Sequence, residues 1–309
     1  MGEDTGAASA EIRTTEIRTT AIRTTGIRTV GICGSGIMGS GLAEVAARGG
    51  FAVVVRSRSR ATGDAMTAAL CSSLDRQVAR GKLTTEARAE LLGRIRTTDD
   101  LDELASCDLV IESVLEDLPV KKAMFAELGA VLADHTVLAT NTSTLPVVEL
   151  AVASGRPDRV CGIHFFNPAP LMTLVEIARP LTASDETIAL ARAFAVACGK
   201  EPVDVADRAG FVVNALLFPY LNHAVRLWEQ GAASMQDIDI AMKGGCNFPM
   251  GPFALLDLVG LDTSLAILDA LHDETRDPGA NAAPTLRRLV AAGRLGRKTG
   301  VGFYEYTAK

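Results

Sequence analysis

The feature that most constrains the fold is a glycine-rich turn, GSGIMG, at residues 34–39. An apolar, β-branched run at residues 29–33 precedes this turn, and small, helix-compatible residues follow it at 37–48. A second apolar run occupies residues 51–55. Strand, GxGxxG turn, helix and strand in this order place a dinucleotide pyrophosphate at the helix N-terminus. The pattern therefore predicts a dinucleotide-binding site at the turn.

Each glycine of the turn suits this use. Gly34 and Gly36 permit a tight turn and a close approach of the ligand to the backbone, while Gly39 lets the helix pack against the strand. A purely structural glycine turn is the less favoured alternative. We therefore expect the cofactor to contact Gly34, Gly36, Ile37, Met38 and Gly39.

Later segments continue the alternation of strands and helices. Helical stretches such as residues 120–133 separate further strand-like runs at residues 109–113, 136–140, 160–164 and 174–178. This alternation predicts an α/β fold with a doubly wound, mainly parallel sheet of the Rossmann type. Strand signals disappear after residue 207, and the helical spacing beyond it predicts an all-helical C-terminal domain.

The predicted organisation has three parts: a low-complexity N-terminal extension over residues 1–26, a cofactor-binding domain over 27–208 and a helical domain over 209–309. The near-repeat EIRTT-EIRTT-AIRTT-GIRTV lies at residues 11–30. Its five-residue period is far shorter than that of any solenoid unit. We interpret it as a tail or a misassigned start site in preference to an oligomerisation strand.

Composition excludes several classes of function. A formal net charge of −6 argues against nucleic-acid binding, which needs a basic surface to neutralise phosphates. The six cysteines form no CxxC pair and have no histidine at metal-ligand spacing, so we expect neither a metal nor a disulfide framework. No apolar run is long enough for a membrane helix, and the N-terminus lacks the apolar core of a secretion signal. We therefore expect a cytoplasmic protein with no membrane partner.

The end of the second predicted strand decides between the two nicotinamide cofactors. An acidic side chain there binds the adenosine ribose and repels a 2′-phosphate. The sequence has RSRSR at residues 56–60 and no acid. Arg58 supplies a planar cation that suits phosphate, and Ser57 supplies a neutral donor. We predict a preference for NADP(H); NAD(H) is the alternative, with the arginines as a solvated loop.

Among four histidines, His164 is the candidate acid/base. It ends the apolar run 160–164, and the carboxyl ends of strands face the ligand crevice in open α/β sheets. Histidine titrates near neutrality and serves alcohol oxidation when a partner orients its ring. Glu176 interrupts an apolar strand, where a carboxylate is costly unless paired, so we expect it to be that partner. Ser143, just beyond another strand, can donate to the substrate oxygen.

Strings along the chain resemble the L-3-hydroxyacyl-CoA dehydrogenase family, in particular the short bacterial 3-hydroxybutyryl-CoA dehydrogenases. The strings are GSGIMGSGLA, VIES, NTSTL, HFFNPAPLMTLVEI, GFVVNALLFP, GPFALLDLVGLD and GRKTGVGFYEY. The resemblance extends from about residue 30 to residue 306. It implies hydride transfer between NAD(P)(H) and C3 of a short-chain 3-hydroxyacyl or 3-oxoacyl thioester, as in fatty acid metabolism. It also implies a homodimer whose helical domain serves substrate binding and dimerisation.

The same resemblance implies roles for individual residues. The HFFNP histidine and the following glutamate form the family's acid/base dyad and map onto His164 and Glu176. The NTS serine maps onto Ser143, near which the nicotinamide is expected, and the GFVVN asparagine maps onto Asn214. The nicotinamide and ribose side of the cofactor corresponds to Glu116, Lys121, Asn167 and Lys298. The family usually has aspartate where Ser57 stands, and this departure supports the prediction of NADP(H).

Three alternatives remain at this point. The first keeps the chemistry but places the acyl group on an acyl-carrier protein in secondary metabolism. The second is a 3-hydroxyisobutyrate-type dehydrogenase, which we discount because residues 207–214 lack the catalytic lysine of that class. The third is a non-catalytic dinucleotide-binding protein, against which the complete set of His, Glu, Ser and Asn argues.

Overall fold

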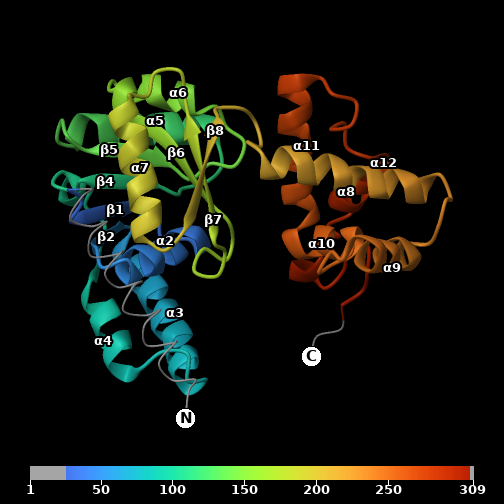
Figure 1. Ribbon diagram of the computed structural model, residues 1–309, viewed down its shortest axis with the longest axis horizontal. Helices are drawn as coiled ribbons and strands as arrows, with labels where there is room; N and C mark the ends of the chain where they lie inside the picture. The colour runs from blue at the N-terminus through green and yellow to red at the C-terminus, as the bar shows by residue number, and fades with distance from the viewer. Residues whose placement is uncertain (1–25, 307–309) are drawn as a thin grey trace, which may run out of the picture. The chain divides into compact units, whose positions relative to one another are not determined.

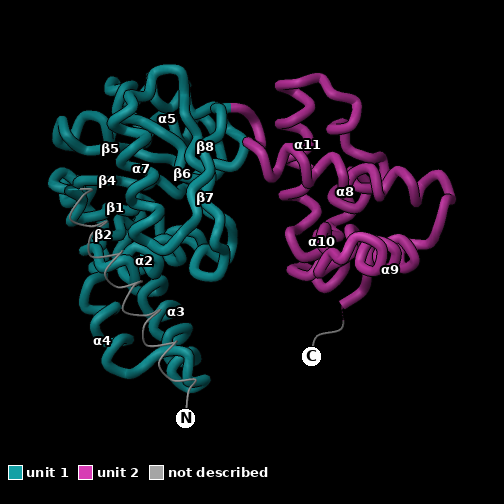
Figure 2. The backbone as a smooth tube through the Cα atoms, viewed as in Figure 1, with its two compact units in different colours: residues 1–207 teal, residues 208–309 magenta. Residues whose placement is uncertain are grey.

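The computed structural model describes residues 26–306, so most of the N-terminal repeat lies outside the described residues. The chain divides into two compact units, the first ending at Asp207 and the second beginning at Arg208 (Figure 2). None of the helices in residues 26–306 is long and apolar enough to cross a membrane.

The first unit is an α/β layer structure around one sheet (Figure 1). Its strands and helices are β1 (Thr29–Cys33), α2 (Ile37–Arg48), β2 (Ala52–Arg56), α3 (Arg60–Ala79), α4 (Thr85–Gly93), β3 (Ile95–Thr98), β4 (Leu109–Glu112), α5 (Leu118–Val131), β5 (Val137–Thr140), α6 (Val147–Ala153), β6 (Val160–Phe165), β7 (Leu174–Arg179), α7 (Asp185–Ala197) and β8 (Glu201–Ala206). Short 3-10 helices lie at Asp102–Leu104 and Pro157–Arg159.

The order of strands across the sheet is β3-β2-β1-β4-β5-β6-β7-β8. Strands β1 to β6 are parallel, β7 pairs antiparallel with β6, and β8 runs parallel to β7. The chain leaves β1 in one direction and returns through β4 on its other side, so the topological switch point lies between β1 and β4. This arrangement confirms the predicted doubly wound, mainly parallel sheet.

The inner strands form where the sequence has uninterrupted apolar runs. Strands β4, β5 and β6 are buried along their whole length, as expected for parallel strands covered on both faces. On one face, Ile32 and Ile163 share a core with α2 and α7, where the tilted rings of Phe51 and Phe194 pack with centroids 5.4 Å apart. On the other, a Cβ at Gly162 would contact Val147 of α6.

Strands β3 and β8 have no counterpart among the strands expected from the sequence. They are the two edges of the sheet, and β8 has the sequence EPVDVA with most of its residues exposed. An edge strand needs no continuous apolar run, because one of its sides faces solvent. Hydrogen bonding to β2 and β7 defines these strands, and that pairing joins segments distant in sequence.

The second unit is helical, which confirms the prediction of an all-helical C-terminal part. Its helices are α8 (Val213–Glu229), α9 (Met235–Cys246), α10 (Pro252–Val259), α11 (Leu261–Thr275) and α12 (Pro284–Ala291), with a 3-10 turn at Arg297–Thr299. An aromatic cluster lies in its core, where Phe253 and Phe303 meet edge to face with centroids 5.0 Å apart and Trp228 contacts both rings.

Asp257 of α10 holds the C-terminal residues onto this unit. Its side chain is 1% exposed and accepts hydrogen bonds from the backbone N–H groups of Phe303 and Tyr304, each at 2.9 Å, and from the Tyr306 hydroxyl at 3.0 Å. Gly302 permits this approach, since a Cβ there would lie 2.0 Å from Oδ1 of Asp257. The buried carboxylate thereby supplies the acceptor for three donors that have no partner within a helix or sheet.

Replacing Asp257 with alanine is expected to destabilise the second unit. The substitution removes the acceptor for three partly buried donors, so the free energy of unfolding should fall by about 3 kcal/mol. Trp228 is the chain's single tryptophan and contacts Phe303, so its fluorescence during urea denaturation reports on this region.

Asp273→Ala is the matched control, because it breaks an ion pair with Arg276 in which the two side chains are 74% and 71% exposed. Its effect should stay within about 0.5 kcal/mol. Equal losses from the two substitutions would contradict the anchoring role of Asp257.

Candidate active site

The glycine turn between β1 and α2 has the geometry of a phosphate cradle. Gly34 has φ +129°, and a Cβ there would lie 2.3 Å from the carbonyl oxygen of Ser113, which follows β4. A Cβ on Gly39 would lie 1.9 Å from the carbonyl oxygen of Gly34, so this position also requires glycine. A Cβ on Gly36 would meet nothing within 4 Å, which leaves open space above the backbone.

The amino end of α2 faces that open space. Gly36 is its N-cap, no side chain caps the helix, and no acidic residue lies in its first turn. Ile37 is 79% exposed at the first helical position, and Met38 is half-buried beside it. Uncapped amides and the helix dipole favour an anion here. The predicted contact residues of the turn therefore fit a dinucleotide pyrophosphate.

A chain of hydroxyl groups replaces the acidic side chain at the end of β2. Ser57 is 1% exposed, and its Oγ lies 2.7 Å from Oγ of Ser35 and 2.6 Å from Oγ1 of Thr62. Thr62 donates in turn to the carbonyl oxygen of Ser59 at 2.9 Å. Arg58, the next residue after Ser57, is exposed. No carboxylate therefore contacts Ser57 in this corner of the site, and the charged side chains lie at its surface.

His164 and Glu176 face each other across the antiparallel pair β6 and β7. The strand register sets these two residues directly opposite, and Nδ1 of His164 lies 2.8 Å from Oε2 of Glu176. Both are buried, with exposed fractions of 4% and 1%. Opposed residues in an antiparallel pair point to the same face. The reversal of chain direction at β7 therefore creates the dyad.

Ser143 completes a three-residue chain at the other ring nitrogen. Its Oγ lies 3.2 Å from Nε2 of His164. Glu116 holds the segment that carries this serine, because its Oε1 accepts from the backbone N–H of Ser143 at 2.8 Å and from Oγ1 of Thr142 at 2.6 Å. Lys121 on α5 lies 3.3 Å from the other oxygen of Glu116. The structure thus gathers five predicted first-unit residues into one cluster.

Glu112 belongs to this cluster and was not among the residues singled out from the sequence. It is fully buried at the end of β4 and accepts from Nζ of Lys121 at 2.7 and 3.0 Å, from Oγ1 of Thr140 at 2.8 Å and from the backbone N–H of Val114 at 2.6 Å. The signal that identifies Glu176 also applies here, since Glu112 is a carboxylate at the end of an apolar strand.

Of the other predicted residues outside the glycine turn and the corner at Ser57, one belongs to the first unit and two belong to the second. Asn167 is exposed just after β6, at the start of the connection to β7. Asn214 and Lys298 belong to the second unit: Asn214 lies in the first turn of α8 and is 8% exposed, and Lys298 donates to both carboxylate oxygens of Asp262 at 2.6 Å. Their functional roles stay predictions.

The arrangement around His164 suits proton transfer. One ring nitrogen is held by a buried carboxylate, which orients the imidazole. The other faces a hydroxyl group, where a reacting oxygen can exchange a proton with it. Within residues 26–306, no group of three or more His, Cys, Asp or Glu side chains is arranged to hold a metal ion.

Comparison with known families covers nearly the whole described chain. Residues 29–208 match the 3-hydroxyacyl-CoA dehydrogenase NAD binding domain, and residues 210–306 match the C-terminal domain of 3-hydroxyacyl-CoA dehydrogenase. The second match begins at residue 210, close to Arg208, where the second compact unit begins.

Individual relatives give the same result. A 3-hydroxybutyryl-CoA dehydrogenase of Mycobacterium tuberculosis is 46% identical over 86% of this chain and 93% of its own length. The mitochondrial hydroxyacyl-coenzyme A dehydrogenase of Sus scrofa is 43% identical over 86% of this chain and 87% of its own length. The crystal structure of (S)-3-hydroxybutyryl-CoA dehydrogenase from Ralstonia eutropha superposes with a TM-score of 0.89 at 42% identity, covering 91% of this chain and all of that one. The chain belongs to the 3-hydroxyacyl-CoA dehydrogenase family.

Proposed function

We propose that this protein interconverts a short-chain 3-hydroxyacyl thioester and its 3-oxo form, as a 3-hydroxybutyryl-CoA dehydrogenase does, with NADP(H) as the preferred cofactor. The observation that carries the proposal is the continuous chain Ser143, His164, Glu176, with contacts of 3.2 and 2.8 Å. Several relatives similar over most of this chain are 3-hydroxybutyryl-CoA dehydrogenases, which supports both the acyl length and coenzyme A as the carrier.

The nicotinamide cofactor supplies or accepts the hydride at C3 of the substrate when it is bound. In reduction, His164 donates a proton from Nε2 to the oxygen on C3, and in oxidation it removes that proton. Glu176 holds Nδ1 and stabilises the charged ring while the proton is on it. Ser143 donates a hydrogen bond to the same oxygen and so stabilises the charge that develops there. Asn214 is assigned the same role only by resemblance to the family.

Binding of the cofactor falls to the strand ends and the glycine turn. Gly34, Gly36 and Gly39 form the cradle described above, and the backbone of Ile37 and Met38 presents the helix amino end to the pyrophosphate. The nicotinamide and its ribose are assigned, by resemblance to the family, to Glu116, Lys121, Asn167 and Lys298. A homodimer is likewise assigned by resemblance.

The preference for NADP(H) rests on the corner formed by β2 and α3. No carboxylate stands at Ser57 to repel a 2′-phosphate, because the neutral hydroxyl groups of Ser35, Ser57 and Thr62 occupy this corner. Arg58 is exposed beside them and supplies a cation whose fork of donors fits phosphate oxygens. Arg60 adds a second positive charge, which Asp99 partly neutralises at a distance of 3.4 Å.

Substituting His164 with glutamine is expected to lower turnover of acetoacetyl-CoA by about two to four orders of magnitude, because the proton donor is lost. The dissociation constant for the cofactor should change little, since the contacts assigned to the cofactor are made by other residues. Cofactor oxidation followed by absorbance gives the first quantity, and quenching of cofactor fluorescence gives the second. His223→Gln is the control, because His223 is exposed on α8. Survival of turnover in His164→Gln would falsify the dyad.

Cofactor preference is measured as the ratio of specificity constants for NADPH and NADH. We expect a ratio above about ten for the unchanged protein, equivalent to about 1.4 kcal/mol of discrimination. Ser57→Asp should reverse the preference, because a carboxylate accepts hydrogen bonds from the ribose hydroxyls and repels the 2′-phosphate.

Arg58→Ala provides a second variant at an exposed position, where folding is not at risk. Its NADPH to NADH ratio should fall by about tenfold as one phosphate contact is lost. Preference of the unchanged protein for NADH would contradict the cofactor assignment while leaving the chemistry at His164 intact.

A further inference from the structure

The connection between β6 and β7, residues 166–173, links the strand of His164 to the strand of Glu176. Within it, the backbone N–H groups of Leu171 and Met172 donate to the carbonyl oxygen of Pro168 at 3.0 and 3.1 Å. One side of the connection lies against α2, since a Cβ on Gly41 would come 3.2 Å from the Cβ of Ala169. Helix α2 is the helix whose amino end forms the phosphate cradle.

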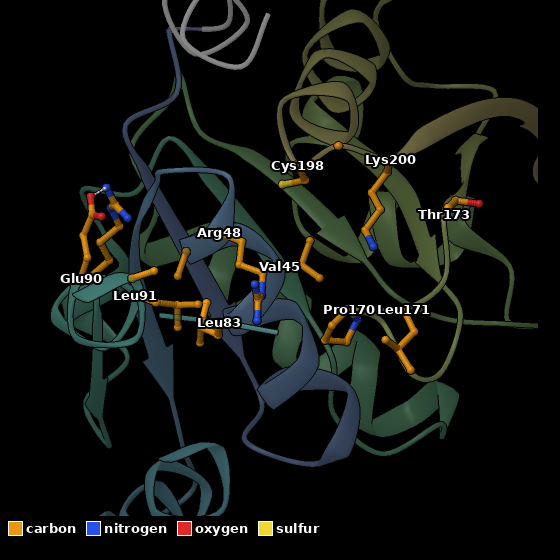
Figure 3. A pocket seen from close by; sticks show the side chains of 14 residues that line it. Val45, Arg48, Leu83, Glu90, Leu91, Pro170, Leu171, Thr173, Cys198 and Lys200 are labelled. Carbon is orange, nitrogen blue, oxygen red and sulfur yellow. Dashed lines mark hydrogen bonds and ion pairs between the residues drawn. The ribbon is translucent and has the colours of Figure 1, made fainter. Parts of the chain in front are cut away.

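The other side of this connection borders an open pocket rather than a packed core (Figure 3). The pocket has a volume of about 350 Å³, and Pro170, Leu171 and Thr173 line it together with residues of α2 and α4. Leu171 is 77% exposed. Apolar packing therefore fixes only part of the connection, and polar contacts must hold the rest.

Lys200 makes two of those contacts, beside the backbone N–H of Glu201, which donates to the carbonyl oxygen of Thr173 at 2.9 Å. Lys200 follows Gly199, whose φ of +71° is the left-handed conformation that glycine adopts without strain, in the turn between α7 and β8. From there its Nζ donates to the carbonyl oxygens of Ala169 and Met172, each at 2.7 Å. Burial lowers the pKa of this ammonium group.

We infer that Lys200 is a positioning residue for cofactor binding: its two bonds tie the β6–β7 connection, with Asn167 at its start, to the turn between α7 and β8. This fixes the connection where Ala169 packs against α2, the helix whose amino end forms the phosphate cradle. No role has been assigned to Lys200 so far, and it contacts neither His164 nor the glycine turn in the hydrogen bonds it makes. The inference rests on the proposed function for the placement of the cofactor and of Asn167.

The positions of His164 and Glu176 do not depend on the two hydrogen bonds of Lys200. His164 and Glu176 are held by four paired positions along the β6–β7 ladder and by their own 2.8 Å contact. Loss of Lys200 should therefore weaken cofactor binding and leave the proton-transfer step nearly unchanged. A purely structural lysine would instead change stability without affecting cofactor affinity.

The test compares Lys200→Met, which keeps the length of the side chain, with Lys200→Arg, which keeps the charge. In Lys200→Met, hydrogen exchange of a peptide covering residues 168–173 should quicken about tenfold, which corresponds to about 1.4 kcal/mol of lost local stability. The dissociation constant for NADPH, from fluorescence titration, should rise about fivefold or more, with kcat for acetoacetyl-CoA within about twofold. Lys200→Arg should restore part of both losses.

Lys122→Met is the control, because Lys122 is a 45% exposed lysine of the same unit that pairs with Glu149 at 3.0 Å. Unchanged exchange at residues 168–173 in Lys200→Met would overturn the inference, and so would faster exchange with unchanged cofactor affinity. An equal response from Lys122→Met would overturn it too. Affinity and exchange are measured without turnover, so they test the role of Lys200 alone. Failure of the unchanged protein to reduce acetoacetyl-CoA would contradict the proposed function and leave those two measurements valid.

Discussion

The register between β6 and β7 is the constraint on which the candidate active site depends. It sets His164 opposite Glu176 and points both side chains to one face, within 2.8 Å of each other. A slip of one residue would turn one of them to the opposite face and leave a buried carboxylate without its partner. Because that desolvation is costly, the pairing of His164 with Glu176 itself opposes the wrong register.

Buried carboxylates play the same part elsewhere in the molecule. Glu112 accepts hydrogen bonds from α5, from the end of β5 and from the loop after β4, and Asp257 accepts three from the C-terminal residues. Asp239 accepts hydrogen bonds from the backbone N–H groups of Phe253 and Ala254 at the start of α10 and from the Tyr304 hydroxyl. Each carboxylate joins segments distant in sequence, so each contributes specificity as well as stability.

The contacts of Glu116 link the segment that carries Ser143 to Lys121 on α5. Its one oxygen holds the backbone of Ser143, and its other lies near Lys121, whose ammonium group is anchored by Glu112. Residues assigned to the cofactor and residues assigned to proton transfer therefore belong to one hydrogen-bonded cluster. Such a cluster has few independent positions, which favours the fixed geometry that hydride transfer requires.

Local sequence determined much of this protein. The glycine turn is decided by short-range sterics, the inner strands by apolar runs, and the helical second unit by periodicity; these follow from neighbours along the chain. His164 and Glu176 were identifiable because a polar residue ending or interrupting an apolar strand requires a reason. The sequence shows that Ser57 replaces an acidic residue, although it does not show that its hydroxyl group is hydrogen-bonded to those of Ser35 and Thr62.

Only the tertiary structure decided the rest. Edge strands β3 and β8 exist through pairing with distant neighbours, and their half-polar sequences give no independent signal. The burial of Ser57 between Ser35 and Thr62, the four hydrogen bonds of Glu112 and the clamp made by Lys200 each need side chains from separate elements. Sequence specifies which groups are present and which stretches are apolar. Which donors meet which acceptors depends on how the packed elements bring them together, because hydrogen bonds act only over about 3 Å.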